Sequence, residues 1–261
     1  MFKNFLGISL LLLVLASCAS RKEMLYYQGI SEAVKADTLT YSPMLKQDDL
    51  LLIAVSAPNP EVAKNFNLSP FEISPDRTII TPLPDQVAVQ RRYQTYLIDN
   101  KGYIEFPVLG SLKLGGLTKN EALTYIKNKL KPYINEPIVN LRILNFKVTV
   151  QGEVGRPGTF SINTERITLP EALSMAGDLT INGKRENILI IREIEGKKSY
   201  HFVDLTKADF INSPFYYLSQ NDVIYVEPNQ TKINSSVIGA NISVILTSVS
   251  LLITIIALLI R

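Results

Sequence analysis

Residues 117–134 read LTKNEALTYIKNKLKPYI, the pattern of one amphipathic helix with a marked start and a marked stop. Thr118 is a good N-cap, and Glu121 three residues later completes a capping box. Apolar residues at helical spacing form one face, and a proline ends the pattern. A second, shorter copy of this signal, RITLPEALSMAGD, follows at residues 166–178. The chain therefore contains two helices of the same kind.

Segments with strand patterns surround both helices. They are short apolar or alternating runs bounded by Asp, Asn, Gly and Pro. Two of them form hairpins, one with the turn DNKG and one with the turn EGKK. The strand segments are 48–57, the DNKG hairpin 93–110, two strands within 137–154, the EGKK hairpin 187–205 and 218–228. We expect an α+β fold made of two small units in tandem.

A proline-rich stretch interrupts the first unit between residues 56 and 92. Prolines at this density exclude helices and central strands. We therefore expect a long ordered insertion there, which is a candidate contact surface.

Composition excludes several classes of function. The net charge is only +3 and no dense Lys/Arg run occurs, so nucleic acid is not an expected partner. One Cys and one His are too few for an intramolecular disulfide or a Cys/His zinc site. His201 lies in a strand pattern without an accompanying nucleophile, and we interpret it as structural. We expect no enzyme, no catalytic residue, no metal and no cofactor.

The N-terminus has the features of a lipoprotein signal peptide. Lys3 precedes a short apolar core, and small residues lead to Cys18 in the run LASC, which resembles a bacterial lipobox. Residues 1–17 would be removed, Cys18 would carry lipid, and residues 18–40 would form a polar tether. Ala19 follows the cysteine, and by the usual sorting rule for lipoproteins this favours the outer membrane.

The C-terminal segment, residues 235–260, is apolar enough for a transmembrane helix. Its small and hydroxyl residues fall on one face when placed at 100° steps. Two interpretations stay open for this stripe, which either packs against another helix or lines a pore filled with water. The stripe consists of Ser236, Gly239, Ala240, Ser243, Thr247, Ser250 and Thr254.

Two sets of motifs, in order, resemble the Wza-type polysaccharide export lipoproteins. The first set is typical of the polysaccharide export domain, and it comprises Asp49, Leu51, Ile53 and Val55, then Asp99, Gly102, Ile104, Pro107, Leu109 and Gly110, then Gly116, Leu117 and Thr118. The second resembles an SLBB domain, a β-grasp module, in VTVQGEVGRPGTF, TLPEALSMAG and NDVIYVEP. The AGG common in SLBB units is AGD here, so Asp178 replaces the second glycine.

The resemblance implies domain bounds of 41–146 for the export domain and 147–229 for the SLBB domain. It also implies an outer-membrane protein with a periplasmic body, which assembles as an octamer whose C-terminal helices form a barrel. Such a channel would export capsular polysaccharide or exopolysaccharide passively. An inner-membrane chain-length co-polymerase, often a tyrosine kinase, would dock on it. The alternative is a glycan-binding periplasmic scaffold lipoprotein that does not conduct.

Overall fold

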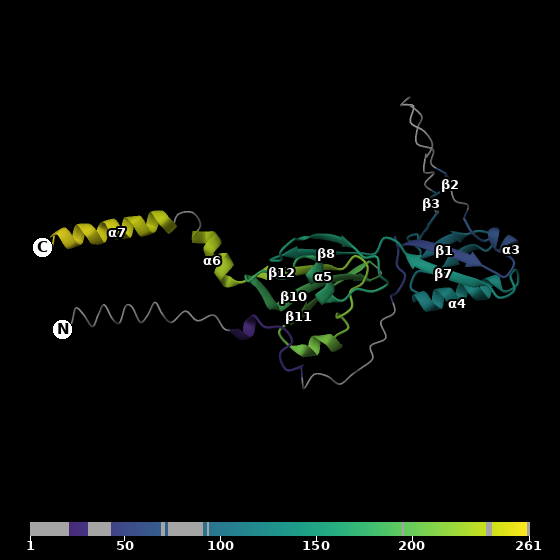
Figure 1. Ribbon diagram of the computed structural model, residues 1–261, viewed down its shortest axis with the longest axis horizontal. Helices are drawn as coiled ribbons and strands as arrows, with labels where there is room; N and C mark the ends of the chain where they lie inside the picture. Colours follow the sequence, from purple (N-terminus) through teal and green to yellow (C-terminus); the bar gives the residue numbers. More distant parts are fainter. Residues whose placement is uncertain are drawn as a thin grey trace, which may run out of the picture.

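The computed structural model describes residues 21–30, 43–68, 71–72, 91–92, 94–194, 196–238 and 242–259. It contains two α+β units in tandem, followed by two helices at the C-terminal end (Figure 1). The expected fold class is therefore confirmed. The first unit lies at one end of the molecule, the second lies in the middle, and helices α6 and α7 lie beyond the second unit (Figure 1).

A three-stranded antiparallel sheet forms the first unit, with strand order β4-β1-β7. Strand β1 alternates between buried and more exposed side chains, so Leu51, Ile53 and Val55 enter the core. Helix α4 covers this core with Ala122, Ile126 and Leu130. The elements are β1 (Leu50–Ser56), β4 (Tyr96–Leu97), β5 (Tyr103–Phe106), β6 (Gly110–Lys113), α4 (Lys119–Leu130) and β7 (Ile138–Ile143).

The predicted hairpin over residues 93–110 is wrong in its pairing. The turn forms, because the Asp99 side chain accepts hydrogen bonds from the backbone N–H groups of Lys101 (2.9 Å) and Tyr103 (2.7 Å). Strand β4, however, pairs with β1, and β5 pairs with β6 in a separate hairpin. The partner of β4 lies far away in sequence, so the local pattern could not identify it.

The proline-rich stretch contains a short helix, which the sequence argument excluded. Helix α3 (Pro60–Lys64) begins with its proline in the first turn, where the missing N–H has no helical partner to lose. Asn59 caps it by accepting from the backbone N–H of Glu61 at 3.2 Å. Strands β2 (Phe71–Glu72) and β3 (Arg91–Arg92) then pair antiparallel, and residues 73–90 lie outside the described residues.

The second unit is built on a mixed five-stranded sheet of order β11-β10-β12-β8-β9, in which β12 and β8 run parallel. The hairpin β10–β11 lies beside β12, and β9 lies beside β8 on the other side of this parallel pair. The elements are β8 (Lys147–Gly152), β9 (Gly158–Ser161), α5 (Leu169–Met175), β10 (Gly183–Ile194), β11 (Lys197–Val203), the 3-10 helix η2 (Ala208–Asn212) and β12 (Val223–Pro228).

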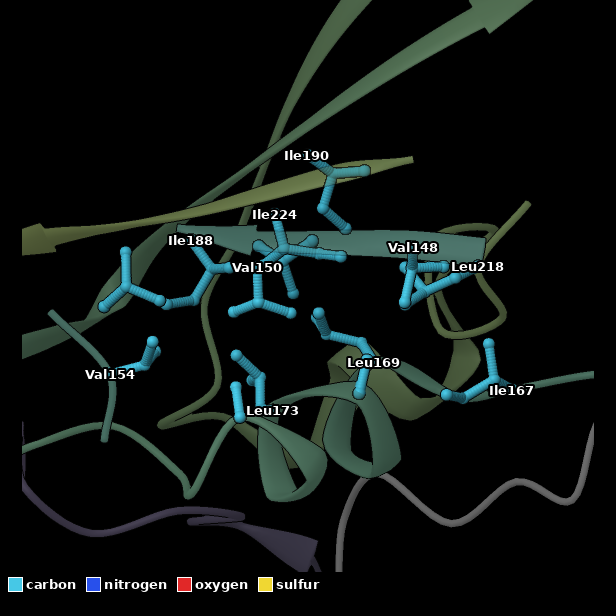
Figure 2. Close-up of a cluster of buried hydrophobic side chains, with 14 of the residues drawn as sticks. Val148, Val150, Val154, Ile167, Leu169, Leu173, Ile188, Ile190, Leu218 and Ile224 are labelled. Atoms are coloured by element: carbon cyan, nitrogen blue, oxygen red, sulfur yellow. The ribbon is translucent and has the colours of Figure 1, made fainter. Parts of the chain in front are cut away.

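Helix α5 covers one face of the five-stranded sheet. Its capping box is as predicted, with Thr168 and Glu171 bonded reciprocally. Figure 2 shows Leu169 and Leu173 of this helix pointing toward Val150 and Ile188 of the sheet. Burial of these branched side chains between helix and sheet is the main source of stability for the unit.

The tether segment contacts the second unit. The 3-10 helix η1 (Arg21–Glu23) is followed by Gln28, which makes a parallel bridge with Lys207. This segment, purple in Figure 1, lies beside the second unit although it precedes the first in sequence. Residues 31–40, which complete the predicted tether, are outside the described residues, as are residues 41–42 and 1–20.

Two helices occupy the C-terminal segment where the sequence predicted one span over residues 235–260. Helix α6 (Gln230–Ile238) follows β12 directly, and α7 (Ile242–Leu259) comes after residues 239–241, which are outside the described residues. The 18 residues of α7 measure about 27 Å, below the roughly 30 Å of a hydrocarbon core. Among the described residues, no helix combines the length and apolarity needed to cross a membrane. The predicted transmembrane helix is therefore not confirmed.

Candidate functional site

The motif residues of the first unit build its fold. Leu51, Ile53 and Val55 are buried core residues of β1, and Ile104 is buried in β5. Thr118 is the N-cap of α4 with its side chain bonded to the backbone N–H of Glu121. These motif residues therefore maintain the fold of the unit, and they carry no reactive group.

Gly102 of this motif set lies against Gly115, and the two glycines allow close approach of two backbone segments. Gly102 has φ of +86°, and its Cα would lie only 2.6 Å from a Cβ added at Gly115. Any side chain at Gly115 would collide with backbone that cannot move aside. The N–H groups of Leu114 and Gly115 both donate to the carbonyl oxygen of Gly102, at 2.9 Å each.

Asp49 is a buried carboxylate in the turn before β1. One oxygen, Oδ2, accepts the backbone N–H of Lys46 at 2.8 Å, and the other, Oδ1, is buried without a hydrogen-bond partner among the described residues. Burial raises the pKa of Asp49 to about 6, with the Lys46 backbone N–H acting in the opposite direction. The aspartate that begins the first motif is thus an acid whose ionised form is disfavoured by burial.

A second buried aspartate has a cation beside it. Asp222 precedes β12, and the Arg192 guanidinium approaches its carboxylate to 2.6 Å through Nη2 and 3.0 Å through Nε. Arg192 Nη2 also donates to the carbonyl oxygen of Tyr217, and the guanidinium lies over the ring of Phe215. This buried pair joins β10 to the turn that precedes its neighbour β12.

Asn145 joins the two units at their short connection. Its side chain accepts from the N–H of Leu50 (2.9 Å) and donates to the carbonyl of Asp48 (2.8 Å). Its own carbonyl accepts from Gln220 Nε2 at 2.7 Å. The turns before β1 and β12 therefore meet at one residue, which couples the two sheets directly.

Lysines of the first unit reach the second beside this junction. Lys46 Nζ donates to the carbonyl oxygen of Glu193 at 3.3 Å, and Lys119 forms an ion pair with Glu165. Burial lowers the pKa of Lys46, against the attraction of the Asp222 carboxylate. A small crevice between the units is lined by Pro43, Met44, Lys46, Ile143, Phe146, Ser219 and Gln220.

The hydroxyl groups of the C-terminal stripe bond within their own helices. Ser236 donates to the carbonyl of Ile233 at 2.7 Å, and Thr254 to that of Ser250 at 2.8 Å. Thr247 and Ser250 make the same kind of contact to a carbonyl one turn earlier. A polar group satisfied in this way can face water or a neighbouring helix at little cost. Neither interpretation of the stripe is therefore tested.

Several predicted residues cannot be placed. Cys18, Gly239 and Ala240 lie outside the described residues, as does the side chain of Ser243. His201 stacks on Phe215 with ring centroids 3.9 Å apart. Within the described ranges, no cluster of three or more His, Cys, Asp or Glu side chains is arranged to hold a metal ion.

Comparison with known proteins assigns both units. Residues 38–144 match the family described as polysaccharide biosynthesis/export protein, and residues 146–226 match the SLBB domain. The first unit therefore belongs to the polysaccharide biosynthesis/export family, and the second is an SLBB domain. The resemblance to the Wza-type proteins of this family, expected from the motifs, is confirmed. We call residues 38–144 the export domain and residues 146–226 the SLBB domain from here on.

Two curated relatives share part of this chain. One is the EPS I polysaccharide export outer membrane protein EpsA of Ralstonia solanacearum, 30% identical over 139 residues, which are 52% of this chain and 36% of that protein. The other is the protein of the same name from Ralstonia nicotianae, 36% identical over 101 residues, which are 37% of this chain and 26% of that protein. The match covers about a third of each relative or less.

Proposed function

We propose that this chain is the subunit of an outer-membrane channel that exports capsular polysaccharide or exopolysaccharide. The observation that carries the proposal is the occurrence of an export domain followed directly by an SLBB domain, in a chain similar to two polysaccharide export outer membrane proteins. Copies of the chain would form a ring, eight of them if the resemblance holds in this respect. Transport would be passive at this protein.

The positions of the tether and of helix α6 on the SLBB domain support one orientation of the chain relative to the membrane. The tether contacts the SLBB domain through Gln28, and helix α6 follows the last strand of the same domain at Gln230. The export domain lies at the opposite end from α6 and α7 (Figure 1). With lipid on Cys18, the SLBB domain would lie near the membrane. The export domain would point into the periplasm. An inner-membrane chain-length co-polymerase, which the family resemblance implies, would dock there.

The C-terminal segments would surround the exit. Eight helices at ~10 Å spacing give a ring ~25 Å across between axes, which leaves ~15 Å open after the thickness of the helices. A glycan chain fits this width. The stripe from Ser236 to Thr254 would then face the lumen, in part packed against the next copy.

Cysteine scanning of the stripe tests the channel. Thr247→Cys and Ser250→Cys should react with a small water-soluble thiol reagent in intact cells. Leu252→Cys, on the opposite face of α7, is the matched control and should stay unmodified. Equal protection of the two sets would contradict pore lining. The native Cys18 gives no background in this assay if its sulfur carries lipid.

A glycan-binding scaffold is the second candidate. The outer strand β11 exposes Tyr200 and Phe202, each with more than half of its surface accessible (61% and 62%), and exposed aromatic rings are typical of binding surfaces. Truncation after residue 235 separates the candidates. A channel loses export, whereas a scaffold keeps both glycan affinity and export.

A further inference from the structure

The segment from Leu25 to Gln28 is bound to the SLBB domain along its backbone. The N–H of Tyr27 donates to the carbonyl of Leu205 at 3.2 Å, and the N–H of Gln28 donates to that of Thr206 at 2.7 Å. The N–H of Ala208 returns a bond to the carbonyl of Gln28 at 3.0 Å. Three backbone bonds hold the segment to the loop between β11 and η2, around the single parallel bridge of Gln28 and Lys207.

Two tyrosine side chains add specific contacts to this backbone pairing. The Tyr26 hydroxyl donates to Asp178 Oδ1 at 2.9 Å, and the Arg185 guanidinium lies over the Tyr26 ring, 5.4 Å from its centroid. The Tyr27 ring stacks on Phe210 at 5.6 Å. Burial raises the pKa of Tyr26, and so does the Asp178 carboxylate, which keeps the hydroxyl a donor.

The receptor residue Asp178 departs from the usual SLBB pattern. Its φ is +61°, a left-handed conformation that glycine adopts freely and that costs other residues energy. The AGG common at this point in SLBB units is AGD in this chain. The aspartate side chain has a use that glycine cannot replace, since it accepts from both Tyr26 and the N–H of Leu179.

We propose that residues Leu25–Gln28 form a strap, that Asp178, Arg185 and Phe210 are its receptor, and that this contact holds the lipid-bearing end of the chain on the SLBB domain. The statement that this contact holds the lipid-bearing end rests on the proposed lipidation of Cys18. Eight residue steps separate Cys18 from Tyr26, and a fully extended chain covers at most about 28 Å over that distance. The strap therefore sets an upper limit on the height of the SLBB domain above the membrane.

Hydrogen exchange on the detergent-solubilised full chain tests the strap directly. We expect the amides of Tyr27 and Gln28 to be protected, and Asp178→Gly to accelerate their exchange about tenfold or more, the equivalent of one hydrogen bond to a charged group. Glycine suits the left-handed backbone at this position, so the variant should fold. Tyr26→Phe should act in the same direction, and Tyr133→Phe, at an exposed tyrosine of the export domain, should have no effect. Exchange of Tyr27 and Gln28 at the rate of an unstructured peptide would overturn the proposal.

Matched insertions test the role of the strap in positioning. Ten Gly/Ser residues between Ser20 and Arg21 lengthen the path from lipid to strap, and they should reduce extracellular polysaccharide several-fold. The same insertion between Val34 and Lys35 leaves that path unchanged, and export should persist. Equal effects of the two insertions would refute the proposal that the strap positions the SLBB domain relative to the membrane. Hydrogen exchange is measured on purified protein. It therefore tests the strap contact independently of whether the wild-type chain exports glycan.

Discussion

Asp49 and Asp222 occupy the same position in two copies of one turn. Each accepts a hydrogen bond from the backbone N–H three residues earlier, Lys46 at 2.8 Å and Ser219 at 2.7 Å. Each follows a residue in the left-handed region, Asp48 in the first copy and Asn221 in the second, with φ of 65° and 64°. Only Asp222 has a guanidinium beside it. The same turn therefore carries a neutralised charge in the SLBB domain and a poorly compensated one in the export domain.

Loss of the Arg192 cation should destabilise the SLBB domain strongly. Arg192→Met leaves Asp222 buried and unpaired, and we expect the free energy of unfolding to fall by about 3–5 kcal/mol. The surface pair of Lys184 and Glu227 supplies the control, because Lys184→Met should cost less than about 1 kcal/mol. Urea titration followed by circular dichroism measures both variants. Similar losses in the two would contradict the importance of the buried pair.

Asp49→Asn should change how stability depends on pH. The pKa of Asp49 is raised to about 6 in the folded chain, above its usual 3.8, so the folded state binds the proton more tightly. The contribution of this group is fully present below pH 4 and is lost as pH rises through about 6. The variant should therefore be more stable than wild type at pH 7.5, by about 1–3 kcal/mol, with no such gain at pH 4.

Asp99 supplies a contrast of opposite sign for this experiment. Its pKa is lowered, chiefly by the backbone N–H of Tyr103, so its contribution is present at neutral pH and is lost as pH falls. Thermal unfolding between pH 4 and 8 compares Asp49→Asn with Asp99→Asn. If both variants change the pH profile in the same direction, the account of Asp49 is incorrect.

Asn145→Ala should loosen the connection between the two domains. The substitution leaves the N–H of Leu50 without its side-chain acceptor, and we expect a loss of about 1–3 kcal/mol. Hydrogen exchange at Leu50 should accelerate accordingly. Asn140→Ala, at an exposed position of β7, controls for the loss of an amide and should leave Leu50 protected.

Local signals in the sequence predicted much of the fold. Both capping boxes formed, at Thr118 and at Thr168, because each depends on residues three positions apart. The strands of the SLBB domain also followed their apolar patterns. Strand pairing between distant segments could not be predicted in this way, because no residue near Tyr96 indicates that β4 pairs with β1.

The contacts that matter most for the site were beyond local reasoning. Tyr26 and Asp178 are 152 positions apart, and no periodicity relates them. The sequence showed Asp178 only as a departure from a glycine pattern. Arg192 and Asp222 likewise read as ordinary strand residues until the sheet brought them together. The helix α3 was missed because proline density was weighed without regard to the first-turn position that Pro60 occupies.

Processing at Cys18 makes a prediction of its own. The mature chain should begin at Cys18 and carry acyl chains, so its intact mass should lack residues 1–17 and exceed the peptide mass by that of the lipid. Cys18→Ser should abolish the lipid. An unmodified thiol at residue 18 would show that the N-terminus is processed in another way.

Particle images of the detergent-solubilised full chain test the central proposal most directly. A channel subunit should appear as a ring with an axis along the lumen, with the SLBB domains and the C-terminal segments at one end and the export domains at the other. Eight-fold symmetry is the expected result. Monomers, or closed assemblies with no passage along the axis, would contradict export through a channel built from this chain.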